Sequence, residues 1–426
     1  MILFTSGGLF ALLAMSIPVG IVLFLLAFGI DAFFSPFPLM RGLGQVVWSS
    51  SNSATLIAIP FFVLLGEILV RSGVARRTYA ALEAWVSWLP GGLIHANIAT
   101  ATLFSATSGS SVATAATVAS VATPQADKLG YDPKLFSGAI AAGGTLGIMI
   151  PPSINLIVYG FLTETSIPKL FLAGLVPGLM LALLFMVVTV IFCVIKPSLG
   201  GPGISATWGK RMAVLVDLVP LLGLFGTIVG VIYAGWATPT EAAAIGVAMA
   251  FAIAATQTRI TWEMVRESLL GTVRTTAMIM LVVIGAYVLN FVLTAAGVSR
   301  ALQDFLGNLG MGALATLLVI VVIYIVLGFF IETLSLMVAT IPIVVPIVEQ
   351  LGYDKLWFGI LMIILVEMAL ITPPVGLNLY VVQGSREKGP LTDVMLGVIP
   401  YALAMLAMVG LLILFPAIAL FLPNTL

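Results

Sequence analysis

Long runs of apolar residues dominate the chain, and short polar stretches separate them. A helix that crosses a bilayer needs about 20 mostly apolar residues. Candidate segments lie at residues 3–30, 54–70, 93–126, 135–163, 168–195, 212–233, 236–256, 276–296, 311–346, 356–384 and 394–422. The pattern predicts an all-α polytopic membrane protein.

Three of these segments contain residues that interrupt helices. Ser108-Gly109-Ser110-Ser111 falls within 93–126, Pro151-Pro152 within 135–163, and Pro373-Pro374 within 356–384. Lipid cannot satisfy the backbone groups that such a break exposes, so a break persists only where protein, water or a ligand supplies partners. We therefore expect broken helices that line a polar cavity.

The chain also repeats itself. Leu129-Gly130-Tyr131-Asp132 recurs as Leu351-Gly352-Tyr353-Asp354, and the offset of 222 (351 minus 129) also pairs Pro151-Pro152 with Pro373-Pro374. Internal repeats around a central site are typical of secondary transporters. We predict a first repeat at 1–200 (scaffold helix, arm, hairpin, broken helices). Residues 201–426 would hold a linker helix and a second repeat of the same parts.

The orientation of the repeats depends on whether 54–70 and 276–296 cross the membrane. If both are re-entrant hairpins, with tips near Pro60 or Gly66 and near Gly285 or Asn290, the repeats are inverted. If both cross, the repeats are parallel, and the distribution of Lys and Arg does not decide between the two topologies. We favour the inverted arrangement, because it places two broken helices around one site.

Composition supports the membrane assignment. Charged residues make up 8% of the 426 residues and hydrophobic residues 61%, against roughly 25% and 45–50% in soluble domains. These values exclude a soluble enzyme, a nucleic-acid-binding protein and a disordered chain. With one Cys and one His, a disulfide framework and a multi-histidine metal or haem site are excluded as well.

The helix breaks carry the polar groups suited to ions and anions. Hydroxyls and free carbonyls around Ser108-Gly109-Ser110-Ser111 are oxygen ligands for a hard cation such as Na⁺, and the adjoining helix N-termini suit a carboxylate. The repeat-equivalent stretch is Glu332-Thr333-Leu334-Ser335. Small residues could instead serve close helix packing, but their symmetric occurrence favours a functional role.

The double prolines form a second pair of breaks. Each is followed by an asparagine, Asn155 after Ser153 in the first repeat and Asn378 in the second, where Thr372 precedes the prolines. Proline removes an N–H donor and forces the preceding residue out of the helix. The asparagines could equally cap the restarted helix or ligate an ion or substrate.

Carboxylates at membrane depth are costly and are candidates for function. Glu332 lies in a predicted break, whereas Glu367 lies within a helix and could pair with a polar neighbour or another subunit. A nucleotide-binding loop and a catalytic pair are absent from the sequence, so we expect a transporter driven by an ion gradient and not an enzyme. The alternative is a membrane subunit of an ion-translocating respiratory complex.

Several motifs together resemble one known family. Trp236-Ala237-Thr238-Pro239-Thr240-Glu241, Ile59-Pro60-Phe61-Phe62, the Ser-Gly-Ser-Ser break and Pro151-Pro152-Ser153 are similar to the large membrane subunit of tripartite ATP-independent periplasmic (TRAP) transporters, of the DctM/SiaM type. The likeness covers essentially the whole chain. One departure is that neutral Val112-Ala113-Thr114 stands where family members often have Ala-Asp.

The resemblance implies an elevator-type transporter of the ion-transporter superfamily in the bacterial inner membrane, driven by Na⁺. It implies a separate small four-helix membrane subunit and a periplasmic substrate-binding protein, which delivers an organic acid such as sialic acid or a C4-dicarboxylate. It also adds Ser53 and Pro60 to the ion site. The predicted substrate-binding residues are Ser110, Ser153, Asn155, Glu332, Thr333 and Asn378, and the predicted Na⁺-binding residues are Ser108, Gly109, Ser111, Ser53, Pro60, Ser335, Thr372 and Pro373.

Overall fold

Helices account for the regular structure throughout the described part of the chain. The computed structural model describes residues 4, 7–9, 11–12, 15, 17–35, 38–201, 206–297, 312–373, 375–386 and 388–425. The helices of the first half are α2 (Val19–Phe34), α3 (Leu43–Ser51), α4 (Ala58–Arg71), α5 (Val74–Val86), α6 (Leu93–Ser108), α7 (Ser111–Leu129), α8 (Pro133–Met149), α9 (Ile154–Thr163) and α10 (Ile167–Ile195). Those of the second half are α11 (Trp208–Ala213), α12 (Val219–Tyr233), α13 (Pro239–Gln257), α14 (Trp262–Ala295), α16 (Ala313–Gly328), α17 (Thr333–Gln350), α18 (Lys355–Ala369), α19 (Leu377–Gly384), α20 (Leu391–Leu414) and α21 (Ala417–Leu420).

The helices have the length and composition of membrane spans. Among the described residues, α10, α13, α14, α17 and α20 are each long and apolar enough to cross a bilayer. Three further pairs qualify together but are bent, by 71° between α4 and α5, by 41° between α8 and α9, and by 49° between 208–217 and α12. The predicted polytopic all-α fold is therefore confirmed.

Two helix pairs form re-entrant hairpins. The Leu93 N–H at the start of α6 donates to the Tyr131 hydroxyl, just beyond the end of α7, at 3.0 Å. In the other pair, the Tyr324 and Thr340 hydroxyls, each eight positions from Glu332, lie 2.5 Å apart. The two helices of each pair therefore run side by side in opposite directions. We call α6–α7 hairpin 1 and α16–α17 hairpin 2.

The predicted positions of the hairpins are wrong. Pro60 and Gly66 both lie inside α4, which bends only after Arg71, and α14 runs without interruption through Gly285 and Asn290. Gly66 and Gly285 serve close packing instead of a turn, because an added Cβ would lie 2.9 Å from the Ser108 carbonyl oxygen and 3.0 Å from that of Gly20, respectively.

The repeat is nevertheless visible in the backbone. Asp132 and Asp354 cap α8 and α18 in the same way, each accepting from the backbone N–H groups two and three residues onward. The preceding turns carry glycines with φ of 70° at Gly130 and 84° at Gly352, a left-handed conformation that glycine adopts without strain. The same sequence motif therefore makes the same structure twice.

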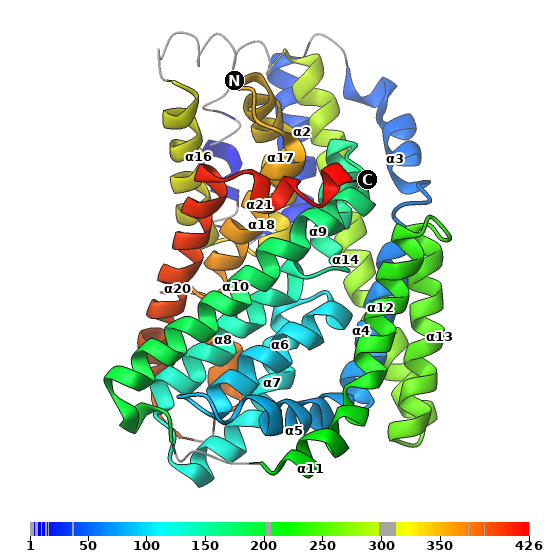
Figure 1. Cartoon of the computed structure of the whole chain (residues 1–426). Helices are drawn as coiled ribbons and strands as arrows, with labels where there is room; N and C mark the ends of the chain where they lie inside the picture. Colours follow the sequence, from blue (N-terminus) through cyan, green and yellow to red (C-terminus); the bar gives the residue numbers. More distant parts are fainter. Residues whose placement is uncertain are drawn as a thin grey trace.

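The two hairpins enter from opposite ends of the molecule. Figure 1 shows α5, which leads into hairpin 1, across the bottom of the view, whereas the outer ends of α16 and α17 lie at the top. This is the arrangement of an inverted repeat. The predicted division of the chain at residues 200 and 201 falls between α10 and α11 and stays a prediction.

Helices α8 and α18 form the centre of the protein. All residues from Leu135 to Met149 and from Leu356 to Ala369 are buried. Helix α8 approaches α20 so closely that a Cβ on Gly138 would lie 2.2 Å from the backbone carbon of Gly397. Such contacts between small residues hold helices together in a membrane, where burial of apolar side chains gives little driving force. They also join the two halves of the chain tightly.

Candidate functional site

The tip of hairpin 1 is a sharp turn made by small residues. Gly109 ends α6 with φ of 58°, and Ser110 is extended and caps α7, its hydroxyl accepting from the Ala113 N–H at 3.4 Å. The Ser108 hydroxyl lies 2.7 Å from that of Thr114. The turn is thus closed by hydroxyls alone, and no charged residue of hairpin 1 caps it.

The tip of hairpin 2 is closed by a carboxylate. Glu332 caps α17, accepting from the N–H groups of Leu334 at 3.1 Å and Ser335 at 3.0 Å. The Thr333 hydroxyl donates to the same carboxylate at 3.1 Å. Negative charge at a helix N-terminus is stabilised by the helix dipole. Glu332 therefore has a local structural role in addition to any role toward a ligand.

The broken helices restart beside these tips. Ser153 caps α9, accepting from the Leu156 N–H at 3.3 Å. At the equivalent break, Gly376 takes φ of 38°, and the Asn378 N–H donates to the Leu370 carbonyl at 3.1 Å across the break. Neither asparagine is the helix cap, so one of the two predicted alternatives, capping, is wrong for Asn155 and Asn378.

All four breaks meet at one cavity of about 120 Å³ between the hairpin tips. The first residues of α7, α9, α17 and α19 line it, and each helix N-terminus carries about half a positive charge and free N–H groups. The lining residues are Gly109, Ser110, Ser111, Val112, Ile148, Ile154, Asn155, Thr275, Met278, Ile279, Glu332, Thr333, Leu334, Leu370 and Leu377. Glu332 neutralises the N-terminus of α17, whereas those of α7, α9 and α19 carry no charged cap and form an environment suited to an anion.

One polar side chain in the cavity lacks a partner within the described chain. The amide nitrogen of Asn155 is buried and makes no hydrogen bond. A buried unpaired donor costs about 1–3 kcal/mol, so this group is a candidate to donate to a bound anion. It is the strongest single indication of ligand contact among the predicted substrate-binding residues.

Glycines on α8 hold hairpin 1 in place. A Cβ on Gly147 would lie 2.8 Å from the Ser110 carbonyl oxygen, and one on Gly144 would lie 3.0 Å from that of Ser111. The tip therefore rests directly on the backbone of α8. The sequence singled out the breaks but gave no role to these two glycines.

A buried carboxylate lies behind the cavity. Glu367 on α18 is fully buried, and its Oε2 accepts a hydrogen bond of 2.5 Å from the Ser111 hydroxyl. The two residues are 256 positions apart. The polar neighbour expected for Glu367 is thus on hairpin 1, and nothing in the sequence could identify it.

The structure brings together only part of the predicted site. Six predicted residues line the cavity: Gly109, Ser110, Ser111, Asn155, Glu332 and Thr333. Six others lie near the breaks outside the lining, namely Ser108, Ser153, Ser335, Thr372, Pro373 and Asn378. Pro374 lies outside the described residues. Thr275 and Met278 of α14, for which we predict no role from the sequence, also line the cavity.

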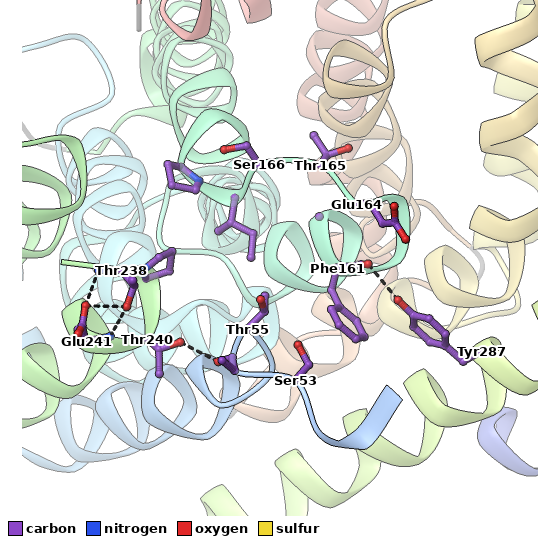
Figure 2. A pocket seen from close by; sticks show the side chains of 15 residues that line it. Ser53, Thr55, Phe161, Glu164, Thr165, Ser166, Thr238, Thr240, Glu241 and Tyr287 are labelled. Atoms are coloured by element: carbon purple, nitrogen blue, oxygen red, sulfur yellow. Dashed lines mark hydrogen bonds between the residues drawn. The ribbon is translucent and has the colours of Figure 1, made fainter. Parts of the chain in front are cut away.

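Ser53 and Pro60 lie elsewhere. Ser53 lines a second cavity of about 670 Å³, formed by the α3–α4 connection, the α9–α10 turn, the start of α13 and Tyr287 (Figure 2). Tyr287 donates to the Phe161 carbonyl there at 3.1 Å. Pro60 lies in the first turn of α4 and lines neither cavity.

The Trp-Ala-Thr-Pro-Thr-Glu motif has a structural role beside this second cavity. Thr238 caps α13, accepting from the Glu241 N–H at 3.3 Å, while the Glu241 carboxylate accepts from the Thr238 N–H at 2.8 Å (Figure 2). Pro239 occupies the first helical position, where a missing N–H costs nothing. The motif is thus a complete capping box.

Comparison with known proteins identifies the family. A family model for the DctM component of tripartite ATP-independent periplasmic transporters matches residues 6–418. The chain belongs to this family. Its motifs were thus interpreted correctly, and the alternative of a respiratory-complex subunit is set aside. The protein is a multi-pass transporter permease of a bacterial TRAP system and not an enzyme.

Curated TRAP permeases cover nearly the whole chain. It is 36% identical over 396 residues to the C4-dicarboxylate TRAP transporter large permease of Pseudomonas aeruginosa, with 90% of each chain covered. It is 32% identical to the sialic acid TRAP transporter large permease of Vibrio cholerae, covering 89% of this chain and 88% of that one. The ectoine TRAP permease of Halomonas elongata is also 32% identical, with 91% of each covered.

Solved structures share the fold. The YdaH transporter of Alcanivorax borkumensis superimposes with a TM-score of 0.62 at 15% identity, covering 94% of this chain and 98% of that one. MtrF of Neisseria gonorrhoeae gives a TM-score of 0.56 at 13% identity, covering 96% and 94%. At these identities the likeness concerns the fold alone.

Proposed function

We propose that the chain is the large permease of a Na⁺-coupled symporter that imports a small organic acid. The observation that carries the proposal is the convergence on one cavity of the N-termini of α7, α9 and α19, none of which has a charged cap. Their N–H groups and dipoles stabilise a carboxylate without any cationic side chain. The described residues that line the cavity include no Lys, Arg or His, and their one charged side chain, Glu332, is bound to the backbone of α17. The backbone and a co-transported cation would therefore balance the charge of the substrate.

Na⁺ is in this proposal a transported ion and not a resident cofactor. Hydroxyl and carbonyl oxygens at the hairpin tips and breaks are the ligands that a hard cation prefers, and Ser108, Ser111, Ser335 and Thr372 supply them. Cation and carboxylate would bind next to each other, each screening the charge of the other. This mutual screening would couple the transport of one to the other.

The substrate that we favour is a C4-dicarboxylate. The small size of the cavity, about 120 Å³, favours a short acid over a sugar acid such as sialic acid. The relative of Pseudomonas aeruginosa, at 36% identity, is named for C4-dicarboxylates. Ser110, Asn155 and Thr333 would contact the carboxylates.

Transport would follow an elevator mechanism. The hairpin tips and both helix breaks surround the site together, and α8 and α18 are buried among them. A body of this kind could move as one unit and carry the cavity between the two membrane faces. A small four-helix membrane subunit and a periplasmic substrate-binding protein would complete the system, as the names of TRAP large permeases imply.

Uptake into proteoliposomes tests the proposal. The purified large permease would be reconstituted with its small subunit and supplied with its binding protein, and entry of labelled succinate or fumarate would be followed with an inward Na⁺ gradient or with choline instead. We expect uptake only with Na⁺, and competition by other C4-dicarboxylates but not by sialic acid. Uptake that is equal in choline would rule out Na⁺ coupling, and uptake of sialic acid alone would rule out the substrate.

A further inference from the structure

Only one of the two carboxylate oxygens of Glu367 accepts a hydrogen bond within the described part of the chain. Its side chain is 0% exposed, Oε2 accepts from the Ser111 hydroxyl, and Oε1 has no hydrogen-bond partner among the described residues. None of the ion pairs found in the described chain includes Glu367. A buried carboxylate without an opposite charge costs several kcal/mol, so either a proton or a bound cation must compensate for the charge of Glu367.

A second buried oxygen without a partner in the described ranges belongs to Asn378, a neighbour of Ser111. The Asn378 side chain is 0% exposed; its amide nitrogen donates to the Ala141 carbonyl at 3.2 Å, and its amide oxygen has no partner in the described structure. The Asn378 amide nitrogen and the Ser111 carbonyl oxygen lie 2.9 and 3.0 Å from one point, the position that a Cβ on Gly144 would take. Asn378 therefore lies beside Ser111, which contacts Glu367.

We propose that Glu367, Ser111 and Asn378 bind one monovalent cation between the two repeats. All the atoms that would coordinate the cation are oxygens, which suits a hard ion. The single carboxylate balances a single positive charge. The inference rests on the Na⁺-coupled transport proposed above and identifies Glu367 as the charged ligand. Because Ser111 also lines the substrate cavity, cation binding would fix the N-terminus of α7 before the acid binds.

Thermal unfolding of the purified protein tests this site without any transport. The midpoint would be measured in NaCl and in choline chloride at equal ionic strength, for the wild type and for Glu367→Gln. A ligand that binds the folded protein raises its stability by an amount that grows with the ratio of ligand concentration to Kd. We therefore expect the midpoint of the wild type to be higher in NaCl than in choline chloride. Glu367→Gln should need at least about tenfold more Na⁺ for the same shift.

The matched control is Thr145→Val. Position 145 is the repeat equivalent of 367 (367 minus 222). The buried Thr145 hydroxyl donates to the Ala142 carbonyl at 2.6 Å and to the Met405 sulfur at 3.9 Å, and neither group belongs to the proposed cation site. This variant removes a buried polar group from the equivalent place and should keep the wild-type response to Na⁺. A loss in both variants would mean that any buried polar deletion causes the effect, which would overturn the proposal.

Other outcomes are equally decisive. An unchanged Na⁺ response in Glu367→Gln, or a wild type that shows no Na⁺-specific shift, overturns the site. If Glu367→Gln does not fold, Ser111→Ala replaces it and should raise the Na⁺ requirement about three- to tenfold; an unchanged requirement again overturns it. Na⁺-independent uptake by the wild type would instead refute the proposed function, so the two failures are distinguishable.

Discussion

The two hairpins reach the same cavity from opposite ends, but different chemical groups complete their tips. In hairpin 1 the neutral Ser110 caps α7 through one long hydrogen bond of 3.4 Å. In hairpin 2 the charged Glu332 caps α17 through two backbone bonds of 3.1 and 3.0 Å. The dipole of α17 is therefore largely balanced by its own hairpin, whereas that of α7 remains available to an anion.

The hairpins also differ in how they rest on the central helices. Hairpin 1 lies against glycines of α8, as at Gly147, whereas the equivalent position on α18 is Ala369. There the glycine is on the hairpin itself, since a Cβ on Gly328 would lie 2.2 Å from that of Ala369. In both repeats the hairpin therefore packs closely on the central helix. In the first repeat the glycine that permits this contact lies on the central helix α8, and in the second it lies on the hairpin. The related halves therefore reach the same close packing with a glycine on different helices.

The largest expected effect comes from filling the space on α8. Gly147→Val places a side chain within 3 Å of the Ser110 and Ser111 backbone, and overpacking of this kind costs about 1–3 kcal/mol. We expect the initial rate of uptake to fall by about fivefold to a hundredfold, on that energy scale. Gly226→Val on α12, where nothing lies within 4 Å of an added Cβ, is the control. Normal uptake by Gly147→Val would show that hairpin 1 does not depend on this contact.

Giving hairpin 1 the charge of hairpin 2 should weaken substrate binding. Ser110→Asp places a carboxylate where the anion is expected, so KM should rise about tenfold, equivalent to about 1.4 kcal/mol. The thermal midpoint should not fall, because Asp is a good helix cap. Ser110→Asn is the matched neutral cap and should keep KM near the wild-type value. If both variants behave alike, the positive end of α7 does not contribute to anion binding.

Removing the carboxylate of hairpin 2 should have a smaller effect. Glu332→Ala leaves two N–H groups of α17 without their acceptor, a loss of about 1 kcal/mol, and uptake should fall about fivefold. Glu332→Gln keeps one acceptor oxygen and should retain most of the uptake. The protein should still fold in both variants, as judged by size-exclusion chromatography. Equal and complete loss in both would indicate that the charge itself is required in transport.

The smallest effect on transport is expected at a cap far from the cavity. Thr238→Ala breaks the capping box of α13 and should cost about 1 kcal/mol of stability. The thermal midpoint should fall by a few degrees at most, while KM stays unchanged. A change in KM would mean that the second cavity, beside this cap, takes part in substrate binding.

Much of the architecture follows from the sequence, because apolar runs, breaks and the repeated Leu-Gly-Tyr-Asp turn are local signals. The hairpins were misplaced because a glycine for packing and a glycine for turning look the same in a sequence. Gly66 packs and Gly109 turns. In addition, each hairpin arm has 16 to 19 residues, nearly the length of a crossing helix, so length could not reveal the re-entry.

Only the part of the site that depends on local signals could be predicted from the sequence. Ser110, Asn155 and Glu332 lie at breaks that the sequence shows directly, and they line the cavity. The bond between Ser111 and Glu367 joins positions 256 apart, and no local pattern carries that information. Ser53 was placed by resemblance alone and lies in another cavity.

The bond between Ser111 and Glu367 also constrains how the protein is made. The ribosome synthesises hairpin 1 long before α18, and helix α20, which packs on α8, comes later still. Until those helices are inserted, the tip of hairpin 1 has neither its buried hydrogen-bond partner nor its complete packing. The first half of the chain therefore cannot reach its final structure during its own insertion, and the last helices made complete the fold of the first.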